Sequence, residues 1–180
     1  MVRSSKGLMA ALVAVRSLGL SSWCIGAGAV RSLVWDALHG FEMPSEIEDV
    51  DVVYFDGAAG SPKQDAYLEE RLRSLLPALH WEVTNQAMVH RWFADALEQV
   101  VPPIGSLEQG VATWPEYATC VGVNLDGNES IGVVAPHGLE DLFGLRVRHN
   151  PLRASVATYR QRVESKRFSE RWPLLSIEAG

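Results

Sequence analysis

Two aspartates at alternate positions of an apolar run carry the first chemical signal in this sequence. Asp49 and Asp51 flank Val50 at the start of the segment 49–56, which reads Asp-Val-Asp-Val-Val-Tyr-Phe-Asp. In a strand, alternate residues point to the same face, so the two carboxylates would lie about 6.6 Å apart along the chain. Mg²⁺ prefers such hard oxygen ligands, together with waters and substrate phosphates. The pair therefore indicates a divalent cation, and two ordinary acids at an exposed strand end are the alternative.

A third acid is expected from a neighbouring strand. Glu82 lies between Trp81 and Val83, so alternation places its carboxylate on one face and its apolar neighbours on the other. If this strand lies beside the first, Glu82 can join the two aspartates. Asp56 competes for the same role, but it lies five positions past Asp51, and a straight strand directs it to the opposite face. We therefore favour Glu82 as the third acid.

A glycine-containing join between a strand and a helix supplies the second feature. Gly26 and Gly28 lie between an apolar strand and the helix expected over residues 29–39, and Arg31 falls in its first turn. Glycine lets the backbone turn tightly and approach a phosphate, and a helix N-terminus offers free N–H groups and a positive dipole end. Arg31 can pair with a phosphate. Alternatively, the glycines serve only the turn.

Hydrophobic periodicity predicts elements that can hold these side chains in place. The expected strands are residues 21–25, 49–56, 81–83, 117–125 and 130–134, and the last two flank a hairpin turn at 126–128. The expected helices are residues 7–15, 29–39, 64–76, 86–100, 138–143 and 152–166. In the first helix, the side chains predicted to pack inward are Leu8, Met9, Leu12, Val13 and Val15.

These elements predict an α/β (α+β) fold, in which a mixed sheet is flanked by helices and followed by a C-terminal hairpin-plus-helix extension. We expect residues 1–105 to form the core and residues 106–180 an extension packed on it, together one compact unit.

Composition excludes several other classes of protein. The 180 residues carry a net charge of −6, which weighs against a protein that coats nucleic acid. Two cysteines are too few for a disulfide framework, and no apolar run approaches the about 18 residues of a membrane span. A cytoplasmic setting is the simplest interpretation. The glycine turn does not match the dinucleotide-binding fingerprint, because Arg31 stands where that fingerprint has its third glycine.

Several other polar residues are more simply structural. Asn85 is placed as a helix N-cap, His90 and His137 are expected to be satisfied structural histidines, and Cys24 is expected in the core. The C-terminal quarter is locally basic, and we expect a solvated helix face there, with an anion-binding surface as the alternative. Its basic residues are Arg146, Arg148, Arg153, Arg160, Arg162, Lys166, Arg167 and Arg171.

The order of these motifs resembles the head of the nucleotidyltransferase superfamily, the fold of DNA polymerase beta. Residues 25–31 look like the Gly-Gly-x-Val-Arg segment of tRNA nucleotidyltransferases and poly(A) polymerases, and residues 49–51 like its paired aspartates. From about Leu8 to Trp172 the chain is similar to small bacterial nucleotidyltransferase-like proteins. Further segments that carry this likeness are residues 28–36, 49–56, 81–90, 112–115, 135–143 and 172–173.

The resemblance implies roles for the residues singled out above. Asp49, Asp51 and Glu82 would be the metal-binding and catalytic carboxylates for Mg²⁺ or Mn²⁺. Gly26 and Gly28 would line the triphosphate of a nucleoside triphosphate. The implied activity is a metal-dependent transfer of a nucleoside monophosphate from that triphosphate to a hydroxyl acceptor that the sequence does not identify. A nucleic-acid acceptor is compatible with the sequence but not favoured, and no membrane partner is expected.

The sequence departs from the superfamily at the glycine turn. Ala27 and Ala29 follow the two glycines, where glycine or serine is common in the superfamily. A methyl group removes a hydroxyl contact and narrows the approach of a phosphate. The alternative is therefore a catalytically degenerate nucleotide-binding or interaction protein on the same fold.

Overall fold

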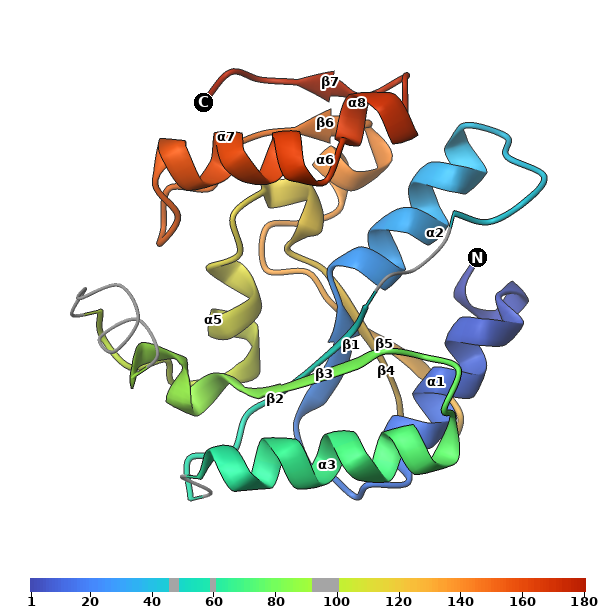
Figure 1. Cartoon of the computed structure of the whole chain (residues 1–180), viewed down its shortest axis with the longest axis vertical. Helices are drawn as coiled ribbons and strands as arrows, with labels where there is room; N and C mark the ends of the chain where they lie inside the picture. The colour runs from blue at the N-terminus through green and yellow to red at the C-terminus, as the bar shows by residue number, and fades with distance from the viewer. Residues whose placement is uncertain (46–48, 59–60, 92–100) are drawn as a thin grey trace.

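A five-stranded mixed sheet organises the chain in the computed structural model, which describes residues 1–45, 49–58, 61–91 and 101–180 (Figure 1). The strands of the sheet are β1 (Trp23–Gly26), β2 (Val50–Tyr54), β3 (Trp81–Asn85), β4 (Gly122–Leu125) and β5 (Ile131–Val134). Their order is β3-β2-β1-β4-β5, with β2 and β3 parallel and the other neighbours antiparallel. The mixed sheet flanked by helices confirms the predicted fold class.

Helices cover the sheet and lie at its ends. The α-helices are α1 (Lys6–Arg16), α2 (Gly28–Leu38), α3 (Pro62–Leu75), α5 (Leu107–Ala112), α6 (Glu140–Phe143), α7 (Val156–Ser165) and α8 (Phe168–Arg171). The 3₁₀ helices are η1 (Val2–Ser4), η2 (Gln86–Met88) and η3 (Tyr117–Thr119). A two-stranded parallel sheet joins β6 (Arg146–Val147) to β7 (Ser176–Ile177). In the part of the chain that the structure describes, no helix is long and apolar enough to cross a bilayer.

The two faces of β2 pack into different clusters, as its alternation predicts. Val52 and Tyr54 belong to the large core that α1, α2 and α3 cover. Val53 belongs to a smaller cluster on the other face, where Leu107 and Val111 of α5 pack against it. The acidic start of β2 therefore shares its face with the smaller cluster.

The C-terminal elements form a layer at one end of the main sheet, beside α2 (Figure 1). Aromatic contacts join this layer to α2, because the rings of Phe168 and Trp172 lie 5.6 Å and 5.1 Å from that of Trp35. A buried ion pair joins it to η3, since Arg162 Nε donates to Glu116 Oε1 at 2.8 Å and Glu116 is fully buried. These contacts hold the last helices over the end of the sheet.

Some local predictions were wrong. Val13 was expected to pack inward, but its side chain is 46% exposed, because the buried stripe of α1 runs through Leu8, Leu12 and Val15. Tyr117–Thr119 forms a 3₁₀ helix instead of the start of a strand. Most of the helix expected over 86–100 lies outside the described residues.

Asp36 in α2 binds both the loop at Ser45 and the C-terminal Trp172 through hydrogen bonds. Its carboxylate accepts hydrogen bonds from the backbone N–H and the hydroxyl of Ser45 and, at 2.8 Å, from the indole N–H of Trp172. Asp36→Ala leaves the buried indole N–H without its acceptor. We expect the free energy of unfolding to fall by about 3 kcal/mol, measured by urea denaturation. Glu70→Ala, which breaks an exposed ion pair with Arg73, should cost less than about 1 kcal/mol. Equal losses in the two variants would contradict this account.

Candidate active site

The parallel register of β2 and β3 brings the predicted acids together. Asp51 lies directly opposite Glu82, and Asp49 lies one position before β2. The Glu82 carboxyl group therefore faces that of Asp51 across the two paired strands. Burial, then the nearby charges of Glu82 and Asp49, raise the pKa of Asp51 to about 6. Lys166 acts in the opposite direction. The cluster is therefore a concentration of negative charge that a cation would relieve.

His80 joins this cluster, although sequence reasoning did not single it out. Its Nδ1 lies 2.6 Å from Oδ1 of Asp49. Ligand atoms of Asp49, His80 and Glu82 all lie within 4.8 Å of one another. The signal that could have found His80 is the register itself, because a strand pair that aligns residue 51 with 82 also brings residues 49 and 80 together.

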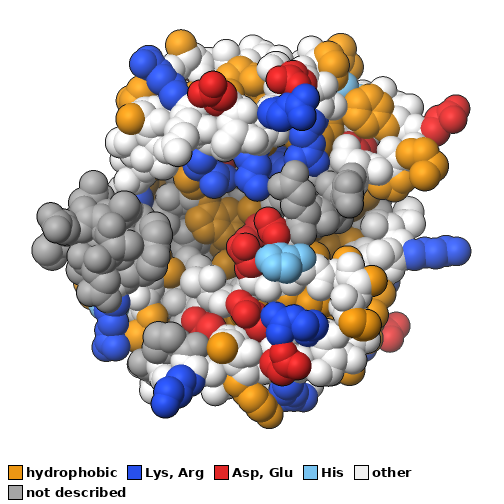
Figure 2. Space-filling view, viewed as in Figure 1, with side chains coloured by type: hydrophobic (Ala, Val, Ile, Leu, Met, Phe, Trp, Pro, Cys, Tyr) orange, Lys and Arg blue, Asp and Glu red, His pale blue; other side chains and the backbone are white. Residues whose placement is uncertain are grey.

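The acids form one wall of a cavity of about 240 Å³, and basic residues form the opposite wall. The basic side chains come from α2 and from the C-terminal layer: Arg31, Arg162, Lys166 and Arg171. Figure 2 shows acidic side chains and a histidine near the centre of this face, with a row of Lys and Arg across a hollow from them. Of the eight basic residues of the C-terminal quarter, three thus line the cavity. A site with this distribution of charge can hold a polyanion together with a cation.

Arg31 is held in this wall by three aromatic rings. Its guanidinium carbon lies 5.0–5.5 Å from the ring centroids of Trp35, Phe168 and Trp172. Burial, with the charge of Arg171 nearby, lowers the pKa of Arg31 to about 10, so the side chain stays charged at neutral pH. Arg31 is 5% exposed, and among the described residues its Nε has no hydrogen-bond partner. A buried cation with an unpaired N–H beside a cavity is suited to an anionic ligand.

The two glycines of the turn have different surroundings. Gly28 begins α2 and lines the cavity together with Ala27. Gly26 ends β1, where a Cβ atom would lie 2.2 Å from the ring of Trp114, so its close packing demands glycine. Ala27 precedes α2 with φ of 42°, a conformation that glycine adopts more easily. It has no polar side-chain atom with which to cap α2, so the N–H groups of the first turn remain available to a ligand.

His90 was expected to be a satisfied histidine, but its buried Nδ1 has no hydrogen-bond partner among the described residues. Three other residues weighed from the sequence have structural surroundings. Asn85 is an N-cap, as predicted, and accepts from the N–H of Ala87 at 3.1 Å at the start of η2. The same amide oxygen accepts from the N–H of Asp56, which lies past the other end of β2. His137 lies 2.9 Å from the carbonyl of Ala112. Cys24 is buried in the core, where burial raises the pKa of its thiol to about 12.

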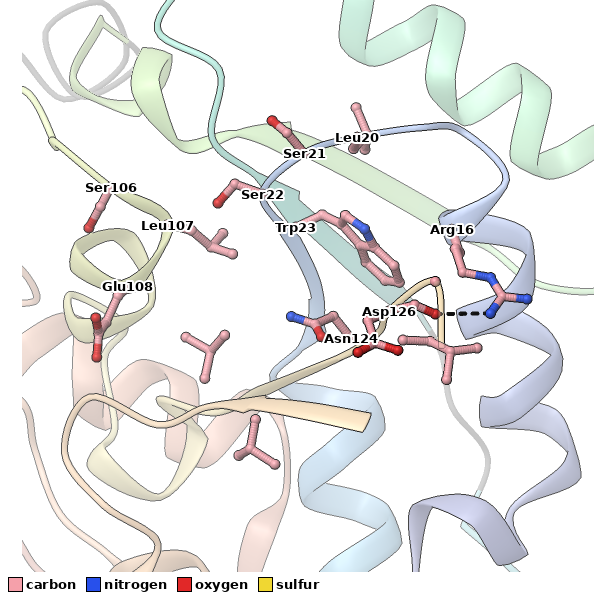
Figure 3. Close-up of a pocket in the computed structure, with 14 residues that line it drawn as sticks. Arg16, Leu20, Ser21, Ser22, Trp23, Ser106, Leu107, Glu108, Asn124 and Asp126 are labelled. Atoms are coloured by element: carbon pink, nitrogen blue, oxygen red, sulfur yellow. Dashed lines mark hydrogen bonds between the residues drawn. The ribbon is translucent and has the colours of Figure 1, made fainter. Parts of the chain in front are cut away.

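A larger cavity, of about 580 Å³, lies elsewhere, between β1, β4 and α5 (Figure 3). Trp23, Asn124, Leu107 and Glu108 line it, and Arg16 donates to the carbonyl of Asp126 at its edge. Its lining includes none of the clustered acids or of the basic residues that face them. The clustered acids and the basic residues that face them therefore line the smaller cavity and not this one.

The backbone at Ala27 generates a prediction on stability. Ala27→Gly relieves the positive φ, and we expect the free energy of unfolding to rise by about 0.5 to 1 kcal/mol despite the greater freedom of the unfolded chain. Ala29→Gly is the matched control, because Ala29 is buried in the first turn of α2 and glycine there should cost about 1 kcal/mol. Chemical denaturation of both variants checks the opposite signs. A loss of stability in both would show that Ala27 is not strained.

The raised pKa of Asp51 generates a second prediction. An acid with a higher pKa in the folded state binds more protons there, so its contribution to stability falls as pH rises from about 4 to about 6. Asp51→Asn removes this cost. With chelator present, we expect the variant to exceed the wild type by on the order of 1 kcal/mol at pH 7.5, and the difference to shrink near pH 4. Urea denaturation at the two pH values measures it, and a variant that is less stable at both would contradict it.

Comparisons with known proteins agree with this geometry. A solved structure described as "The NMR structure of the protein reveals a CCA-adding enzyme head domain" matches with a TM-score of 0.81 and 29% identity over 98% of this chain and 91% of that one. A CCA-adding enzyme in complex with CTP matches with a TM-score of 0.55 and 13% identity over 96% of this chain and 40% of that one. A tRNA-processing enzyme complex matches with a TM-score of 0.54 and 16% identity, over 93% and 43% of the two chains.

The two larger enzymes share only the fold with this chain, which spans less than half of their length. Among curated proteins, none matches the chain significantly. A family model described as "Nucleotidyltransferase" matches residues 13–177, which is nearly the whole sequence. The chain therefore belongs to this nucleotidyltransferase family.

Proposed function

We propose that the chain is a metal-dependent enzyme that transfers a nucleoside monophosphate from a nucleoside triphosphate to a hydroxyl acceptor. The observation that carries the proposal is the pairing of Asp51 with Glu82 in register, beside Asp49 and across one cavity from four basic residues. Membership of the nucleotidyltransferase family supports the reaction class. Asp49, Asp51 and Glu82 are the proposed catalytic and metal-binding residues, and Gly26, Gly28 and Arg31 the proposed nucleotide-binding residues.

The donor set fits a divalent cation. Three carboxylates line one cavity, and burial, together with the charges of Glu82 and Asp49, raises the pKa of Asp51. Mg²⁺ and Mn²⁺ take such oxygen ligands and retain sites for substrate phosphates. When bound, such an ion supplies charge neutralisation at the phosphates and lowers the pKa of the acceptor hydroxyl.

The residues of the chain divide the remaining work between binding and proton transfer. Arg31, Lys166 and Arg171 face the negative charge of the triphosphate, and the first turn of α2 offers N–H groups to the same anion. Gly28 allows the close approach of a phosphate, whereas Gly26 contributes through the packing that shapes the turn.

The proposed reaction is an in-line displacement at the α-phosphorus. A bond forms between the acceptor oxygen and that phosphorus, and the bond to the bridging oxygen breaks as pyrophosphate leaves. Glu82, the third acid, is the residue proposed to accept the proton of the acceptor hydroxyl.

Pyrophosphate release in the presence of Glu82 and Asp56 variants tests the proposal. ATP, CTP, GTP and UTP are each supplied with Mg²⁺ or Mn²⁺ and a panel of hydroxyl acceptors that includes RNA 3′ ends. We expect Glu82→Gln to lower release by at least about 100-fold, because a carboxylate that faces Asp51 is lost. Asp56→Asn is the matched control, because Asp56 lies outside the cavity, and it should keep activity within about threefold.

A thermal-shift measurement separates the alternatives. Nucleotide-dependent stabilisation without pyrophosphate release under any condition would contradict the enzyme and favour a binding protein, for which the methyl groups of Ala27 and Ala29 provide a reason. A ligand at about 100 times its Kd adds about 2.7 kcal/mol of stability, which such a measurement detects readily. Equal losses in Glu82→Gln and Asp56→Asn would contradict the assignment of the third acid.

A further inference from the structure

The acidic cluster contains a histidine, His80, in addition to its carboxylates. His80 Nδ1 is 2.6 Å from Oδ1 of Asp49, and a ligand atom of Glu82 completes a group within 4.8 Å. The backbone fixes this position, because the N–H of Val50 donates to the carbonyl of His80 at 2.8 Å where β2 and β3 begin to pair. The imidazole is therefore directed at the cluster by the same register that aligns Asp51 with Glu82.

We propose that His80 is a metal ligand, and that the site selects a transition-metal ion of the Mn²⁺ to Zn²⁺ series over Mg²⁺. Imidazole nitrogen suits these ions, whereas Mg²⁺ prefers oxygen ligands and retains its waters. Two carboxylate oxygens and one imidazole nitrogen form a mixed donor set of the kind that binds Mn²⁺, Fe²⁺, Co²⁺ or Zn²⁺. This inference deepens the proposed function, on which it rests, by naming the class of cofactor.

The surroundings of His80 support a ligand more than a structural role. The side chain is 65% exposed, so it contributes little to the core. It contacts Asp49, and Asp49 lines the cavity that Arg31 also lines with its buried, unpaired N–H. That N–H is an independent sign that the cavity receives a ligand, because a buried donor left without an acceptor costs stability.

The acids and His80 come from one side of the cavity, and basic residues are among those that line the rest of it. Asp49 precedes β2 and Glu82 lies in the neighbouring β3, and Lys166 and Arg171 line the same cavity. Asp49, Glu82 and His80 would hold such an ion beside Asp51, and water and phosphate oxygens would supply its remaining ligands. His80 thus changes the preferred metal without blocking the nucleotide.

Mn²⁺ bound to the purified 180-residue chain, with no nucleotide present, tests the inference by electron spin resonance. Pulsed measurements should detect ¹⁴N coupling from a directly bound imidazole in the wild type, and His80→Gln should abolish it. By titration, His80→Gln should weaken Mn²⁺ and Zn²⁺ binding by at least about tenfold and Mg²⁺ binding by less than about threefold. His137→Gln, outside the cavity, is the matched control and should change none of these values.

Each outcome decides the matter. Absence of ¹⁴N coupling in the wild type, equal losses of Mn²⁺ and Mg²⁺ affinity in His80→Gln, or the same changes in His137→Gln would overturn the inference. Pyrophosphate release with Mg²⁺ but no nitrogen coupling would overturn it while the proposed function stands. Nitrogen coupling without any pyrophosphate release would support the metal site and contradict the proposed function.

Discussion

The parallel pairing of β2 with β3 is the constraint on which the site depends. It aligns Asp51 with Glu82 and sets His80 against Asp49, so several groups that would repel one another or compete for protons are held on one face. The apolar side chains on the other face, Val52 and Val83 among them, are buried and resist any slip of the register. A shift by one residue would turn every acid into the core. Packing of the core therefore holds the mutually repelling carboxylates together in the cavity.

The basic wall offsets the negative charge of the acids, and its residues come from distant parts of the sequence. Arg31 comes from α2, yet its guanidinium is enclosed by Phe168 and Trp172 of the C-terminal layer. Arg162 is fixed by the fully buried Glu116. The two walls differ in origin, since the acids depend on strand register and the cations on aromatic and ionic contacts between layers. The geometry of the cavity thus depends on how the C-terminal layer packs against α2.

Alternation within strands was enough to predict which acids share a face, and Asp49, Asp51 and Glu82 do lie together. It was not enough to find His80, because that contact depends on a register between segments 31 positions apart. The cage around Arg31 was also beyond the sequence, since no local pattern relates residue 31 to Phe168 or Trp172. Val13 was misjudged because a short apolar helix offers several stripes, and only the packed sheet selects one. The division near residue 105 stays a prediction, and β4 and β5, which follow it, complete the main sheet.

Two of the three aromatic rings around Arg31, those of Phe168 and Trp172, lie near the end of the 180 residues, and this order has a consequence for biosynthesis. A ribosome adds residues in order, so the strands that carry the carboxylates emerge well before Phe168 and Trp172. Until those rings arrive, Arg31 lacks its enclosure and the acids lack the cations of α7 and α8 as counterions. The nascent chain therefore contains its carboxylates before the basic wall of the cavity is complete, and the cavity can be finished only after Phe168 and Trp172 have emerged.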